Sequence, residues 1–70
     1  MVTAEVERIV HSVLTDYGVP MTLRSVAARG DVWDVTLAPR GGGQPVRLVI
    51  HAGVAHTVRR SLIAALSIND

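Results

Sequence analysis

The chain has 70 residues, of which 49% are apolar and none is cysteine, and its net charge is +1. A chain this short forms one domain at most, with a marginal core, because it buries only about 60% of its unfolded surface. The composition excludes a disulfide framework, a thiolate metal site and a strongly basic nucleic-acid binder.

The segment from Thr3 to Tyr17 is predicted to form an amphipathic helix. Thr3 suits the N-cap position, whereas Gly18 and Pro20 are typical residues just beyond a helix C-terminus. Apolar residues recur at spacings of three and four, the helical period: Val2, Val6, Ile9, Val13 and Tyr17.

Two strands are predicted next, joined by a turn at Gly30-Asp31. The first, Met21 to Arg29, has no clearly apolar face, so the sequence does not show which of its side chains face the core. The second alternates clearly, with Trp33 among the apolar positions, and it ends at Pro39. We therefore expect Trp33 to anchor the core on the face of the sheet that the helices cover.

A glycine-rich loop, residues 40–45, precedes a third predicted strand, Val46 to His51. A phosphate-binding loop would lead into a helix N-terminus, and here a strand follows, so a hairpin loop is favoured. A second helix is predicted from Val54 to Ser67, capped by either Gly53 or Thr57. The expected fold is a single α+β domain ordered helix–strand–strand–strand–helix, with a three-stranded antiparallel sheet and both helices on one face.

The histidines give no complete chemical site. His51 and His56 flank the predicted turn between the third strand and the second helix, but no third ligand lies nearby, and a metal site needs three or four. Ser12 adjoins His11 on a helix, where neighbouring side chains point in different directions. We therefore expect no bound metal, no cofactor and no catalytic residues.

Four residues are candidates for nucleic-acid binding. Arg59 and Arg60 begin the second predicted helix, where a phosphate could meet positive charge and free backbone N–H groups. Arg47 and His51 lie on the polar face of the third strand. The alternative interpretation, which the absence of any other basic cluster favours, is that these side chains are simply solvated.

The order of elements resembles the double-stranded RNA-binding domain, whose second helix begins with basic residues that contact phosphates and read shape. The chain also resembles the HicA-type toxins, small mRNA interferases with the same fold. Their motifs are matched by Asp16-Tyr17-Gly18, Arg29-Gly30, Val49-Ile50-His51 and Thr57-Val58-Arg59-Arg60-Ser61-Leu62-Ile63. The family's catalytic histidine has no counterpart, because Asp31 and Val32 follow Gly30, so the resemblance implies a scaffold without that chemistry.

We therefore predict a noncatalytic interaction domain that self-associates or binds a protein partner, in the cytoplasm. The alternatives are a weak RNA-binding domain and, third, a divergent mRNA interferase. No segment is apolar enough to predict membrane insertion. Self-association is favoured by apolar residues that the predicted core leaves without a place: Val10, Val26, Val32, Val49, Ile63 and Ile68.

Overall fold

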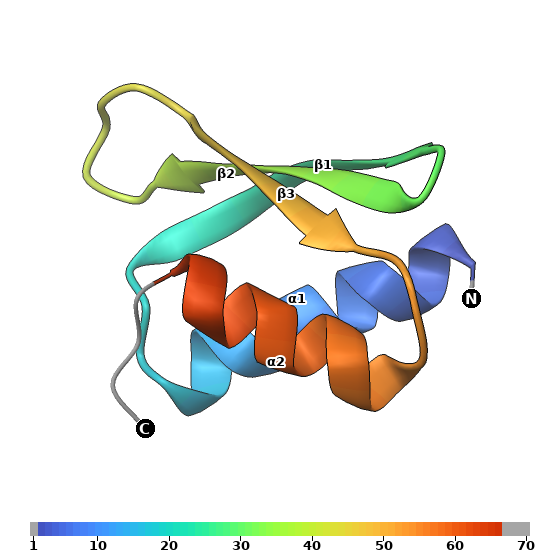
Figure 1. Cartoon of the computed structure of the whole chain (residues 1–70). Coiled ribbons are helices and arrows are strands. Elements are labelled where there is room, and N and C mark those ends of the chain that lie inside the picture. Colours follow the sequence, from blue (N-terminus) through green and yellow to red (C-terminus); the bar gives the residue numbers. More distant parts are fainter. Residues whose placement is uncertain (1, 67–70) are drawn as a thin grey trace.

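The computed structural model describes residues 2–66, which form the five predicted elements in the predicted order (Figure 1). They are α1 (Thr3–Asp16), β1 (Met21–Arg29), β2 (Val32–Pro39), β3 (Val46–His51) and α2 (Ala55–Ala65). The strands form one antiparallel sheet in the order β1-β2-β3. Both helices lie side by side on one face of it, with α1 in contact with β1 and α2 in contact with β3. The predicted α+β fold is confirmed.

α1 begins at Thr3 as predicted and ends at Asp16, one residue before the predicted end, with Tyr17 as its C-cap; the residue at its N-cap differs from the prediction. Val2 is the N-cap residue and Thr3 is already helical; the Val2 backbone N–H donates to Glu5 Oε1 at 3.4 Å. The predicted N-cap at Thr3 is therefore wrong by one residue. At the other end Gly18 has a φ of 61°, and the Val19 N–H donates to the Leu14 carbonyl at 2.9 Å, as in a Schellman cap.

The start of α2 is also set by a valine. Val54 is the N-cap residue, and its carbonyl accepts the first helical hydrogen bond from the Val58 N–H at 3.0 Å. Neither Gly53 nor Thr57 caps the helix, so both predicted caps are wrong. Val58, which donates this bond, is fully buried on the helix face that packs into the core. The helix ends at Ala65 with Leu66 as its C-cap, which is earlier than predicted; the predicted last residue, Ser67, itself lies outside the described residues.

The core lies between the sheet and the two helices. Trp33 is 6% exposed, which confirms it as a core residue. Val10, predicted to be left over, is fully buried, because the apolar stripe of α1 is wider than one row of side chains. Ile9 and Leu66 pack at the margin of the core. The buried apolar residues are Val6, Val10, Val13, Leu14, Trp33, Val35, Leu37, Leu48, Ile50, Val58 and Leu62.

A β-bulge settles the facing of β1, which the sequence left open. The register with β2 shifts between Leu23 and Ser25, so Arg24 is an extra residue in the strand. Leu23 pairs with Leu37, and Val26 pairs with Val35, so both lie on the helix-covered face. A strictly alternating strand would have placed Leu23 and Val26 on opposite faces, which is why neither face looked apolar.

Candidate interaction surfaces

The face of the sheet opposite the helices, here called the open face, is covered by no helix or strand within residues 2–66 (Figure 1). The two-residue Gly30-Asp31 turn, with Gly30 at a φ of 60°, fixes the pairing of β1 with β2. That pairing and the pairing of β2 with β3 define the residues of the open face: Thr22, Ser25, Ala27, Arg29, Val32, Asp34, Thr36, Ala38, Arg47, Val49 and His51.

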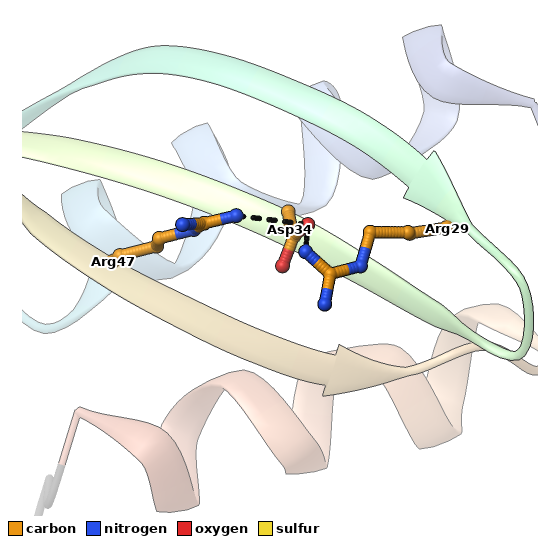
Figure 2. Close-up of polar contacts among 3 residues, drawn as sticks. All are labelled: Arg29, Asp34 and Arg47. Atoms are coloured by element: carbon orange, nitrogen blue, oxygen red, sulfur yellow. Dashed lines mark hydrogen bonds and ion pairs between the residues drawn. The ribbon is translucent and has the colours of Figure 1, made fainter.

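Two arginines meet one carboxylate in the middle of the open face (Figure 2). Arg29, at the end of β1, donates from Nη1 to Asp34 Oδ2 at 3.1 Å. Arg47, on β3, donates from Nη2 to the same oxygen at 3.3 Å. The three strands thus each supply one member of a cluster, Arg29–Asp34–Arg47, that carries one net positive charge.

Burial is unequal within this cluster. Asp34 is only 8% exposed, and its Oδ1 is buried and accepts no hydrogen bond from any residue that the structure describes. The side chains of Arg29 and Arg47 are 69% and 64% exposed. Desolvating a carboxylate is costly, and pairing with cations that remain in water offsets this cost only in part because the solvent screens them. We therefore expect the cluster to contribute little to stability.

We expect Asp34→Val to leave the free energy of unfolding unchanged or to raise it by up to about 2 kcal/mol. Valine suits a central strand and removes the buried charge together with the unsatisfied oxygen. Urea denaturation monitored by circular dichroism measures the difference, with Asp34→Asn as the control that keeps the shape of the side chain. A loss greater than about 2 kcal/mol in the valine variant would show instead that the ion pairs stabilise the fold.

A second surface is a groove of about 310 Å³ between α1 and α2, with Ile9 and Ala55 as its apolar lining. Its polar lining is Arg8, Ser12, His56 and Arg59. Arg59 is held in place, because it donates to Ser12 Oγ at 3.2 Å and to Asp16 Oδ2 at 3.0 Å. Its charge is therefore already paired with a carboxylate of α1.

The structure does not bring the four predicted nucleic-acid-binding residues together. Arg47 and His51 lie on the open face, and both are exposed. Arg59 lies in the groove between the helices, and Arg60 is exposed on α2. The arginines are therefore divided between two faces of the molecule and do not form one basic surface.

The sequence did not lead us to predict Arg29 or Asp34 as site residues. A signal for this pair was present, since a two-residue turn at Gly30-Asp31 sets Arg29 opposite Val32, and Asp34 follows two residues later on the same face. Such diagonal neighbours are within reach of a long side chain. The contact of Arg47 was harder to foresee, because it depends on the register across the glycine-rich loop.

Within residues 2–66, no three histidine, aspartate or glutamate side chains gather in a group that could hold a metal ion. In the same part of the chain, no helix has the length and apolar character needed to span a membrane.

Comparison of the chain with protein-family models gives no match, and comparison with curated proteins and solved structures gives no significant match. The similarity to HicA-type toxins and to double-stranded RNA-binding domains therefore stays a prediction.

Proposed function

We propose that this chain is a noncatalytic domain that binds another protein through the open face of its sheet. The observation that carries the proposal is the Arg29–Asp34–Arg47 cluster, in which a buried carboxylate pairs with two exposed arginines. Beside it Val49 is 60% exposed, whereas most of the other large apolar side chains are buried or half-buried. Arginine beside exposed apolar surface is typical of protein interfaces. The cytoplasmic location expected from the sequence is part of the proposal.

An external partner is favoured over a second copy of the chain. Self-association was predicted from leftover apolar residues, but Val10 is in the core, and Val26, Val32 and Ile63 are half-buried. Of the predicted set only Val49 is largely exposed within the described residues, and Ile68 lies outside them. The apolar surface available for a homodimer is therefore smaller than the composition suggested.

RNA binding is the second candidate function, and the groove between the helices favours it. Arg8, His56 and Arg59 line that groove, and Arg60 is exposed on the same helix as Arg59. The resemblance to double-stranded RNA-binding domains implies phosphate contacts at the start of this helix. Asp16 already pairs with Arg59, however, so few charges remain for phosphates, and any binding should be weak and sensitive to salt.

Site-specific photocrosslinking tests the proposal. A photoreactive benzoylphenylalanine at position 49 reports on the open face, and the same residue at position 64, exposed on α2, is the matched control. In extracts of the source cells we expect a discrete protein adduct from position 49 and none from position 64. Adducts to RNA alone, or equal adducts from both positions, would contradict the proposal.

Self-association is checked on the purified chain by sedimentation equilibrium. We expect a monomer of 7.5 kDa at high micromolar concentration. A dimer that Val49→Asp dissociates would instead identify the partner at the open face as a second copy of this chain.

A further inference from the structure

The arginines of the Arg29–Asp34–Arg47 cluster have N–H donors that Asp34 does not use. A guanidinium has five N–H donors in a planar fork, and each of these arginines binds Asp34 through a single nitrogen. Both side chains are more than half exposed. Because one oxygen atom holds both guanidiniums, they lie close together in a defined arrangement over β2 (Figure 2).

The side chains beside the cluster are short and apolar. In the sheet register Asp34 lies between Ala27 on β1 and Val49 on β3. Alanine and valine side chains are shorter than that of arginine, so they do not block access to the two guanidiniums. An extended segment of a partner can therefore lie along the strands and contact both. Such a segment would meet positive charge at the arginines and an apolar contact at Val49.

The charge of the cluster indicates which kind of partner fits this face. A two-fold symmetric dimer would place the same patch against itself, so two positively charged clusters would face each other. A nucleic acid gains its affinity from many phosphate contacts, but the cluster offers only two cations, Arg29 and Arg47, which is too few for a polyanion and enough for a single carboxylate. A carboxylate side chain matches the guanidinium fork and can bind in bidentate fashion.

We propose that the open face binds an extended acidic segment of a partner protein, with a carboxylate held by Arg29 and Arg47 and an apolar side chain on Val49. This inference rests on the proposed protein-binding function and names the chemistry of the partner. Asp34 serves as a positioning residue, because it holds both arginines in place without contacting the segment.

The test is a titration of the isotope-labelled chain, followed by amide chemical shifts, with a short peptide that alternates glutamate and leucine. The comparison peptide has glutamine in place of every glutamate. We expect saturable shifts at Ala27, Asp34 and Val49, and at least tenfold weaker binding of the glutamine peptide. Equal affinity for the two peptides, or shifts confined to α1 and α2, would overturn the inference.

Charge-conserving variants distinguish hydrogen bonding by the guanidinium fork from nonspecific electrostatic attraction. The double variant Arg29→Lys/Arg47→Lys keeps the net charge and loses the fork, so we expect at least fivefold weaker binding of the acidic peptide. Arg60→Lys, an exposed position on α2, is the matched control and should bind as the wild type does. An unchanged affinity in the double variant would overturn the inference, as would tighter binding of an RNA oligonucleotide than of the peptide at the open face.

The two proposals fail in different ways. A protein adduct from position 49 that forms equally well in the Arg29→Lys/Arg47→Lys variant would leave the protein-binding function intact and overturn the acidic partner. The absence of any protein adduct from position 49 would overturn the protein-binding function itself.

Discussion

Replacing Trp33 with alanine should lower the free energy of unfolding by about 3–5 kcal/mol. Trp33 lies on the helix-covered face of the central strand, pairs with Ile50 of β3, and is almost fully buried. A domain of this size has a total stability of roughly 4–10 kcal/mol, so the variant loses about a third of it or more. Urea denaturation followed by far-ultraviolet circular dichroism measures the loss.

Trp33→Phe is the matched control for this prediction. The indole Nε1 is buried and donates no hydrogen bond to any residue within the described part of the chain. Phenylalanine keeps an aromatic ring in the core and removes this unsatisfied donor, so we expect a cost of only about 1 kcal/mol. Equal losses in the alanine and phenylalanine variants would show that Nε1 has a partner that matters. A wild-type fluorescence emission as red as that of the unfolded chain would contradict the burial of Trp33.

The fold was predictable because most of its elements carry their own periodic signal. Apolar residues at helical spacing marked α1, and the alternation through Trp33, Val35 and Leu37 marked β2. The turn at Gly30-Asp31 and the break at Gly18 followed from residues that tolerate positive φ. Once these elements are fixed, the sheet offers the only large apolar face on which two helices can pack.

The details that the sequence did not predict depend on contacts between elements. A bulge at Arg24 has no local signal of its own and is fixed by the pairing of β1 with β2. Both helices begin after a valine, Val2 or Val54, whose side chain makes no cap hydrogen bond, and at α1 the Glu5 carboxylate accepts from the Val2 N–H instead. Propensity for capping is a weak guide where packing decides the boundary.

The candidate site was predicted only in part, and for a physical reason. The alternation of β2 assigns Asp34 to the open face, but its burial arises because two arginines from neighbouring strands lie over it. Net charge gave no indication of this cluster, since a total of +1 is the same whether the arginines are scattered or paired. Only the register of three strands brings Arg29 and Arg47 to one oxygen atom.

Replacing Leu62 with alanine should destabilise the domain by about 2–5 kcal/mol and loosen α2 more than α1. Val58 and Leu62 are the only buried residues of α2, whereas α1 has four. Removing one of two anchors therefore weakens the packing of α2 against α1 and β3 disproportionately. Amide hydrogen exchange measures this directly, and protection should fall first along α2.

Ile63→Ala is the matched control for Leu62→Ala, since Ile63 is half-buried at the margin of the core and should cost only about 1 kcal/mol. Equal costs for the two variants, or equal loss of protection in α1 and α2, would contradict the prediction. The Arg29–Asp34–Arg47 cluster lies on the opposite face of the sheet from α2 (Figures 1 and 2). The folded fraction of Leu62→Ala should therefore bind the acidic peptide with the affinity of the wild type. If it does, the helix layer supports the fold while the open face carries the binding.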